Sequence, residues 1–218
     1  ASVSIFSNLL QTAEDKTFII PGGSTPVLFY NYLANEKIDW TGVKLIPSDE
    51  RLVPEDSPQS NTGMIRRNLI ENIKGGDEPE LFSILNGNDP NKTEKIVSSI
   101  NCRTKHLLPP RAAFLGIGKD GHTASLFHDS KHDTKSGDQF QLVDRSGESY
   151  QRITVSFSVL INTPMIIYLV SGNSKKYSIE SILYEEFENF KSPVRTVIEE
   201  SKGDVLILCD RDASPSNI

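Results

Sequence analysis

The chain has 218 residues and a formal net charge of -6, from 23 Lys and Arg against 29 Asp and Glu. Its composition, 37% hydrophobic and 24% charged, is ordinary for a globular protein and excludes a disordered chain, a collagen and a disulfide scaffold. The acidic balance and the lack of a basic block argue against a nucleic-acid or anionic-membrane partner, because both require Lys and Arg to neutralise phosphates.

Short β-rich runs alternate with helix-patterned stretches along the chain, which is typical of βαβ units and a mainly parallel sheet. The predicted strands, in chain order, are 17–20, 44–47, 81–85, 112–115, 141–144, 153–157, 165–170 and 205–209. The predicted helices are 26–36, 62–73, 91–101 and 175–187. Because the strand runs lack strict polar alternation, most of them are expected to be buried on both faces.

The length fits one large domain or two small ones. Since neither a long flexible linker nor a repeat interrupts the pattern, we expect a single α/β domain over residues 1–218, with a small additional αβ lobe as an open alternative. The most polar loop is 127–137. In open parallel sheets the ligand binds at the carboxyl ends of the strands, so the chemistry is expected there.

The first motif at such an end is PGGSTP at 21–26, between a strand and a helix. Gly22 and Gly23 allow the backbone to approach a ligand closely. Ser24 or Thr25 can cap the helix, and Pro26 suits its first position. A helix N-terminus with free N–H groups favours phosphate. A well-capped helix after a tight turn is an equally good interpretation of these residues alone.

The second motif is SDER at 48–51, after the strand 44–47. It places Asp49 and Arg51 at a strand end, and Asn61 opens the next helix. A guanidinium such as that of Arg51 can form a bidentate pair with a phosphate or a carboxylate. Taken alone, however, this motif is more typical of a solvated loop with internal ion pairs.

The third motif, LGIGKDGHTASLF at 115–127, is the most specific and predicts a strand, a glycine-rich loop and then a helix. Its glycines, Gly121 among them, permit a turn that brings Asp120 and His122 to the strand end. Histidine titrates near neutrality, so a positioned imidazole can take a proton from water, which is worth roughly 10²- to 10⁴-fold in rate.

Two further cations stand at element boundaries. Arg152 enters a strand in RIT, and Lys175 ends GNSK at the start of a predicted helix, where it could bind an anion together with the helix N–H groups. By themselves they would be interpreted as an exposed edge arginine and a surface lysine. The motifs provide no cluster of His, Cys and carboxylates with the spacing of a metal site.

The two cysteines and the other three histidines are assigned no role. Cys102 and Cys209 are too few for a disulfide framework, lack CxxC spacing and are expected to behave as small hydrophobes beside apolar runs. His106, His128 and His132 lie in polar contexts and are expected to face solvent.

No segment reaches the roughly 18 apolar residues that span a bilayer. Residues 1–10 lack the basic region and long apolar stretch of a signal peptide. These observations predict a cytoplasmic, reduced protein.

Together, GGSTP, SDER with a downstream SN, GIGKDGHTASLF, RIT and GxxK resemble the 6-phosphogluconolactonase family in order and approximate spacing. This family is a branch of the sugar-phosphate fold that also holds glucosamine-6-phosphate deaminases. The resemblance covers about residues 17–209. It implies a modified Rossmann-like α/β fold, no redox cofactor, and hydrolysis of 6-phospho-D-glucono-1,5-lactone to 6-phosphogluconate in the pentose phosphate pathway. The implied partner is a small phosphorylated sugar lactone, and the oligomeric state is left open.

The resemblance assigns His122 as the general base that activates water for attack on the lactone carbonyl. It assigns the phosphate to the loop 22–25, with Arg51 and Lys175 holding the phosphate or the developing negative charge. Asp120 either orients the histidine or binds a sugar hydroxyl. A further group is assigned to substrate binding: Asp49, Asn61, Gly121 and Arg152, the last of which either touches the substrate or supports the pocket.

The chain departs from the family pattern at several positions. Pro47 and Ser48 stand where the family commonly has an aromatic-Gly pair before DER, and His128 stands where it has a proline. The tail VLILCDRDAS replaces a Trp-containing ending. These departures bear on pocket walls and substrate fit more than on the reaction class.

Two alternatives compete with lactone hydrolysis. In the deaminase branch the motif resembles DGHIAFNEP, with a carboxylate five residues after the histidine, whereas this chain has Phe127 there. A tyrosine also ends the deaminase triplet where this chain has Arg51. The other alternative is a catalytically silent sugar-phosphate-binding module, against which the intact His122 and Arg51 argue.

Overall fold

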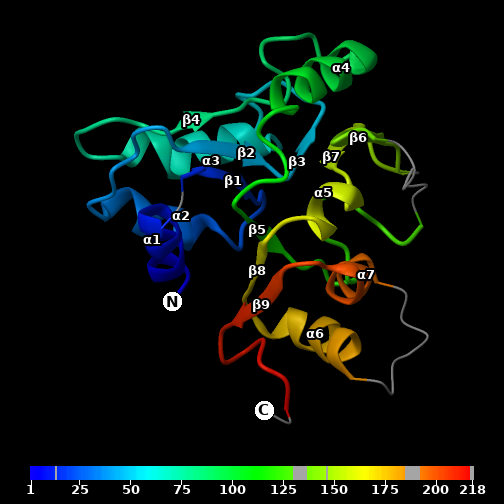
Figure 1. Cartoon of the computed structure of the whole chain (residues 1–218). Coiled ribbons are helices and arrows are strands. Elements are labelled where there is room, and N and C mark those ends of the chain that lie inside the picture. The colour runs from blue at the N-terminus through cyan, green and yellow to red at the C-terminus, as the bar shows by residue number, and fades with distance from the viewer. Residues whose placement is uncertain (13, 130–136, 146, 185–191, 217–218) are drawn as a thin grey trace.

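A computed structural model describes residues 1–12, 14–129, 137–145, 147–184 and 192–216. Its main sheet has six strands in the order β4-β2-β1-β5-β8-β9, and every neighbouring pair is parallel. The strands are β1 (Thr17–Ile20), β2 (Lys44–Pro47), β4 (Glu80–Leu81), β5 (Ala112–Gly116), β8 (Met165–Val170) and β9 (Asp204–Cys209). The α/β fold class with a mainly parallel sheet is therefore confirmed (Figure 1).

A second, antiparallel sheet lies beside the first, in the order β3-β7-β6. It consists of β3 (Asp49–Arg51), β6 (Phe140–Val143) and β7 (Arg152–Val155). Ser48 connects the two sheets, because its N–H donates to Ile20 O in the main sheet and its carbonyl accepts from Val155 N in the small one. The carboxyl ends of β1 and β2 therefore face the small sheet.

Helices cover both faces of the main sheet (Figure 1). Those described are α1 (Ser2–Thr12), α2 (Val27–Asn35), α3 (Asn61–Asn68), α4 (Thr93–Thr104), α5 (Phe157–Ile161), α6 (Lys176–Leu183) and α7 (Pro193–Glu200), with short 3-10 turns η1 (Ile70–Asn72) and η2 (Asn173–Lys175). Among the residues that the structure describes, no helix is both long enough and apolar enough to cross a membrane.

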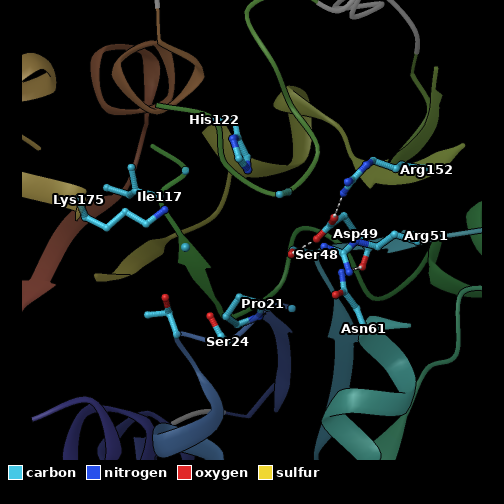
Figure 2. A pocket seen from close by; sticks show the side chains of 16 residues that line it. Pro21, Ser24, Ser48, Asp49, Arg51, Asn61, Ile117, His122, Arg152 and Lys175 are labelled. Carbon is cyan, nitrogen blue, oxygen red and sulfur yellow. Dashed lines mark hydrogen bonds and ion pairs between the residues drawn. The ribbon is translucent and has the colours of Figure 1, made fainter. Parts of the chain in front are cut away.

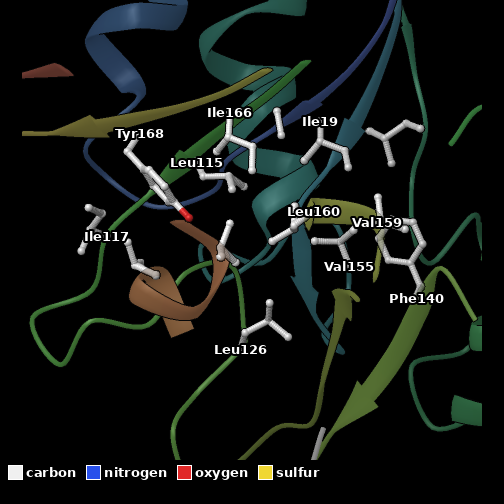
Figure 3. Close-up of a cluster of buried hydrophobic side chains, with 14 of the residues drawn as sticks. Ile19, Leu115, Ile117, Leu126, Phe140, Val155, Val159, Leu160, Ile166 and Tyr168 are labelled. Atoms are coloured by element: carbon white, nitrogen blue, oxygen red, sulfur yellow. The ribbon is translucent and has the colours of Figure 1, made fainter. Parts of the chain in front are cut away.

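Alternate residues of the central strands belong to two separate hydrophobic cores, because successive side chains of a strand point to opposite faces of the sheet. Phe18 and Phe114 pack against α1 and α2, where Phe6 and Phe29 lie within 4.8 to 5.6 Å of them, measured between ring centroids. On the other face, Ile19, Leu115 and Tyr168 belong to the core beneath α4 to α7 and the small sheet, which Figure 3 shows. This two-sided burial matches the absence of polar alternation in these strands.

Several expectations about elements need correction. The strand predicted over 81–85 is only Glu80–Leu81, and α1, α5, α7 and β3 were not predicted. β9 is an edge strand with partly exposed residues rather than a strand buried on both faces. Cys102 and Cys209, which were expected to behave as small hydrophobes beside apolar runs, are both exposed. His106 and His128 face solvent as expected, whereas His132 and the end of the helix predicted over 175–187 lie outside the described residues.

Candidate active site

A cavity of about 230 Å³ opens at the carboxyl ends of β1, β2 and β5 and the adjoining end of the small sheet. Figure 2 shows His122 on one side, Lys175 nearby, Pro21 and Ser24 across from them, and a cluster around Asp49 and Arg51. The lining residues are Pro21, Gly22, Gly23, Ser24, Thr25, Ser48, Asp49, Arg51, Asn61, Gly116, Ile117, Gly118, His122, Ala124, Arg152 and Lys175.

Glycine is required at two positions of the loop 22–25. A Cβ on Gly22 would collide with the Asn61 carboxamide, which donates from Nδ2 to Asp49 O at 2.9 Å. Gly23 has a φ of 83°, in the left-handed region that other residues rarely adopt. The loop therefore follows the cavity wall closely, with its backbone unobstructed by side chains at 22 and 23.

The start of α2 differs from the prediction. Pro26 is the residue before the first helical residue, and no side chain caps the helix, so neither Ser24 nor Thr25 serves as the expected cap. Both instead line the cavity. Their hydroxyl groups are consequently not used by the helix terminus.

The SDER motif is a buried strand, not the solvated loop that its charge indicates. β3 pairs with β7, and Glu50 is fully buried. Oε1 of Glu50 accepts from Arg51 N at 2.8 Å and Asn61 N at 2.7 Å, while Oε2 accepts from Thr62 N at 2.7 Å and Ser60 Oγ at 3.0 Å. A buried carboxylate therefore satisfies free N–H groups at the start of α3 and fixes β3 to that helix. Burial raises the pKa of Glu50, and the hydrogen bonds act in the opposite direction.

Asp49 and Arg51, on either side of Glu50, both line the cavity. The Asp49 side chain accepts from Ser125 Oγ at 2.6 Å and from the neighbouring Ser48 Oγ at 3.0 Å, so the histidine loop helps to hold it. Arg51 donates from Nη1 to Gln59 O at 2.7 Å, while its buried Nε has no hydrogen-bond partner among the residues that the structure describes. The guanidinium is thus anchored at one end, beside the space for a ligand.

The loop after β5 places the histidine. Gly118 must be glycine, because a Cβ there would stand 2.7 Å from Asp120 Oδ1 and closer still to the His122 ring. Gly118 N also donates to His122 O at 2.7 Å, which closes the loop on itself. The predicted strand and glycine-rich loop are present, and they present His122 to the cavity.

The helix predicted after this loop is absent. Residues Thr123 and Leu126 instead form an isolated bridge, and Ala124 has a φ of 50°. Tertiary hydrogen bonds explain the difference: Thr123 Oγ1 donates to Gly116 O at 3.0 Å, and Ser125 N donates to Thr154 Oγ1 at 3.1 Å. The segment therefore satisfies its polar groups against the two sheets rather than by helical bonds.

His122 and Asp120 form a pair through His122 Nδ1 and Asp120 Oδ1. Burial alone would raise the pKa of Asp120, but the hydrogen bonds and charge of His122 outweigh it, and the pKa is lowered. An ionised Asp120 accepts a proton-bearing Nδ1, which leaves Nε2 of the neutral ring as a proton acceptor. Of the two roles left open for Asp120, orientation of the histidine is the one that this contact supports.

α6 and α7 hold the histidine loop from outside. Ser178 Oγ donates to Lys119 O at 2.7 Å, and Gly121 O accepts from Ser192 Oγ at 2.7 Å and from Val194 N at 3.2 Å. Gly121 has a φ of 74° and does not line the cavity, so its assignment to substrate binding stays a prediction.

Arg152 is only 8% exposed, unlike the edge arginine that its position indicated. Its Nε donates to Glu148 Oε2 at 2.7 Å, and its Nη1 lies 3.9 Å from Asp49 Oδ2. With carboxylates on two sides, Arg152 supports the cavity wall and also contributes to its lining.

Lys175 ends η2 and extends into the cavity from the opposite side to Arg51 (Figure 2). The turn before it depends on Gly172, which has a φ of 86° and whose N–H donates to the Asp210 carboxylate at 3.0 to 3.1 Å. Burial lowers the pKa of Lys175 and Lys119 lowers it further, while Asp120 acts in the opposite direction.

The structure thus brings ten of the twelve candidate residues to one cavity, whereas Asp120 and Gly121 lie behind His122. Sequence reasoning missed Glu50, Ser125 and Glu148, which position the lining residues. Glu50 stood within SDER and could have been recognised as a partner of the helix N-terminus that follows. No group of His, Cys, Asp and Glu in the described ranges has the arrangement of a metal site.

Polar loops that converge at the carboxyl ends of a parallel sheet, with an imidazole beside cationic side chains, define an α/β enzyme for a small anionic substrate. The chain belongs to the glucosamine-6-phosphate isomerase/6-phosphogluconolactonase family, whose model matches residues 2–207.

Relatives named 6-phosphogluconolactonase are similar over most of the chain. The protein from Xylella fastidiosa is 31% identical over 192 residues, which cover 84% of this chain and 77% of the relative. The protein from Thermotoga maritima is 32% identical over 175 residues, covering 78% and 76%.

Solved structures share the fold. A structure described as devB protein has a TM-score of 0.84 at 25% identity and covers 97% of this chain and 91% of its own. A monomeric glucosamine-6-phosphate deaminase has a TM-score of 0.76 at 19% identity, covering 97% and 92%, which shows the fold alone. The shared fold therefore does not by itself separate a lactonase from a deaminase.

Proposed function

We propose that the chain hydrolyses 6-phospho-D-glucono-1,5-lactone to 6-phosphogluconate, a step of the pentose phosphate pathway. The observation that carries this proposal is the contact between His122 and Asp120 beside a cavity that cationic side chains also line. The names of the similar relatives from Xylella fastidiosa and Thermotoga maritima support the same activity.

His122 is the general base of the proposed reaction. Asp120 holds Nδ1 and its proton, so Nε2 accepts a proton from a water molecule in the cavity. The ring also packs against the Phe127 ring, with 4.6 Å between their centroids. Orientation and tautomer are thus both set before the substrate binds.

The hydrolysis follows in two steps. As Nε2 of His122 takes the proton, the water oxygen forms a bond to the lactone carbonyl carbon, which becomes a tetrahedral oxyanion. The bond from this carbon to the ring oxygen then breaks, and the imidazolium returns its proton to the ring oxygen. The reaction consumes one water and needs no electron acceptor. Hydrolysis therefore requires only a base, an anchored phosphate and stabilisation of the oxyanion.

The phosphate is proposed to bind the loop 22–25 together with Arg51 and Lys175. The loop offers backbone N–H groups and the hydroxyls of Ser24 and Thr25, all at the entrance to α2. Since the protein carries a net charge of -6, attraction of a phosphate ester must come from these local groups rather than from the overall field.

Deamination is the second activity within the family, and Phe127 disfavours it. The position five residues after His122 holds a buried phenyl ring, 1% exposed, where the deaminase pattern supplies a carboxylate. Ring opening and departure of an amine would therefore lack that proton-handling group.

A lactonase assay and a thermal-shift titration on the same sample test the proposal. We expect turnover of the phosphorylated lactone, stabilisation by 6-phosphogluconate and no ammonia release from glucosamine 6-phosphate. Stabilisation without turnover would favour the catalytically silent binding module, and ammonia release would favour the deaminase.

A further inference from the structure

The segment between β6 and β7 contacts both neighbours of the catalytic imidazole from outside the cavity. Arg145 Nη2 lies 3.6 Å from Asp120 Oδ2, whereas His122 contacts the other carboxylate oxygen, Oδ1. Arg145 Cζ also lies 4.0 Å from the centroid of the Phe127 ring, which in turn packs against the His122 ring. One guanidinium therefore holds the two groups that flank the imidazole.

We propose that Arg145 is a positioning residue for the general base: it fixes Asp120 and Phe127 against His122 and offsets part of the Asp120 charge. This inference rests on the proposed function. Arg145 does not line the cavity, so it acts through Asp120 and Phe127 and not by touching the substrate.

Glu148 sets the position of Arg145. Its Oε1 lies 3.5 Å from Arg145 Nη1, and its Oε2 accepts from Arg152 Nε at 2.7 Å. The two carboxylate oxygens thus connect Arg145, behind the histidine loop, to Arg152 in the cavity wall. Charges of alternating sign run from Asp120 through Arg145 and Glu148 to Arg152.

Other charged groups also face the pair. Lys175 of η2 interacts with the Asp120 charge, and Lys119 of the histidine loop acts on Lys175. The hydrogen bonds that α7 and its N-cap make to this loop come from uncharged groups, Ser192 Oγ and Val194 N. Lys119 and Lys175 remain in place when Arg145 is changed, so a change in the titration of His122 reports the loss of the guanidinium itself.

The sign of the effect follows from the charges. Without Arg145, the Asp120 carboxylate is less compensated and attracts a protonated imidazole more strongly. A general base must be neutral, so the acidic limb of the kcat/KM profile moves to higher pH. Removing Glu148 takes away a negative charge and leaves Arg145 to Asp120 alone, so this limb moves to lower pH.

Imidazole NMR titrations of Arg145→Gln and Glu148→Gln, compared with pH profiles of kcat/KM, test the inference. The chain has four histidines, and the spectrum of His122→Gln assigns the relevant signal. For Arg145→Gln we expect an upward shift of about 0.5 pH unit, as for a partly exposed ion pair. Arg66→Gln, an exposed residue of α3, makes the same change in net charge and should shift nothing.

Opposite shifts in the two variants would support the positioning role. If His122 titrates in both variants as it does in the parent protein, the inference is wrong, whatever the change in thermal stability. Should Arg145→Gln fail to fold, Glu148→Gln alone decides between a downward shift and none. NMR observes the imidazole without turnover, so it tests the positioning role independently of activity. A parent protein that lacks lactonase activity would contradict the proposed function, but it would not change the interpretation of the titration.

Discussion

Replacement of Gly118 by alanine tests how precisely the histidine must be held. The backbone of Gly118 does not lie in the left-handed region, so the effect of a methyl group is purely steric. The new Cβ would stand 2.7 Å from Asp120 Oδ1, where ordinary contacts begin at 3.4 Å. The carboxylate must retreat by the difference, about 0.7 Å, and the His122 ring by more, because it is nearer.

A misplacement of about 1 Å at a catalytic group costs on the order of 10²-fold in rate. We therefore expect Gly118→Ala to lower kcat/KM for the phosphorylated lactone by about 10²-fold. The side chain of His122 is 32% exposed, so it can swing outward and the loss of thermal stability should be small.

The assay is steady-state hydrolysis of the lactone, with thermal unfolding measured in parallel. Gly137→Ala is the matched control, because a Cβ there meets no atom of the described residues within 4 Å and the backbone is not in the left-handed region. A kcat/KM for Gly118→Ala within threefold of the parent would refute the claim that close approach of this loop fixes the base.

Other predictions concern the anion, the buried carboxylate and metals. Arg51→Ala and Lys175→Ala should raise KM for the phosphorylated lactone far more than for unphosphorylated gluconolactone; equal losses would show that these cations do not bind the phosphate. Because the pKa of Lys175 is lowered, KM should rise at a pH below that at which an exposed lysine deprotonates, and Lys175→Arg should abolish this rise. Glu50→Ala should lower the free energy of unfolding in urea by about 3 to 5 kcal/mol, since three backbone N–H groups lose their acceptor. The control is Glu71→Ala, at an exposed position. A similarly small loss of unfolding free energy in both variants would contradict the role of Glu50. Activity should survive chelators. A loss of activity in EDTA that Zn²⁺ or Mg²⁺ reverses would contradict a metal-free mechanism.

The parts of the site that follow strands were predictable from the sequence. Gly22, Asp49 and His122 each come shortly after an apolar run, and the ends of parallel strands meet at one edge of the sheet. The βαβ pattern alone is therefore enough to predict that these residues converge. Roles within the site came from the family resemblance, because spacing alone does not distinguish a base from a solvated histidine.

The parts that depend on long-range contacts were not predictable. Charges in SDER are typical of a surface loop, and only the N–H groups of the α3 terminus, about eleven residues further on, explain the burial of Glu50. Likewise, 122–127 has helix-compatible residues, but Thr123 and Ser125 bond to other elements. By contrast, the start of α7 is predictable, because a Ser192 cap followed by Pro193 is typical of a helix N-terminus.

The kcat of His122→Ala tests the central claim most directly. The general-base mechanism predicts that kcat for 6-phospho-D-glucono-1,5-lactone falls by at least roughly 10²-fold. Thermal stabilisation by 6-phosphogluconate should persist, because the phosphate is assigned to the loop 22–25 and its cations. A near-normal kcat in a folded His122→Ala protein would contradict the account and remove His122 from the role of base.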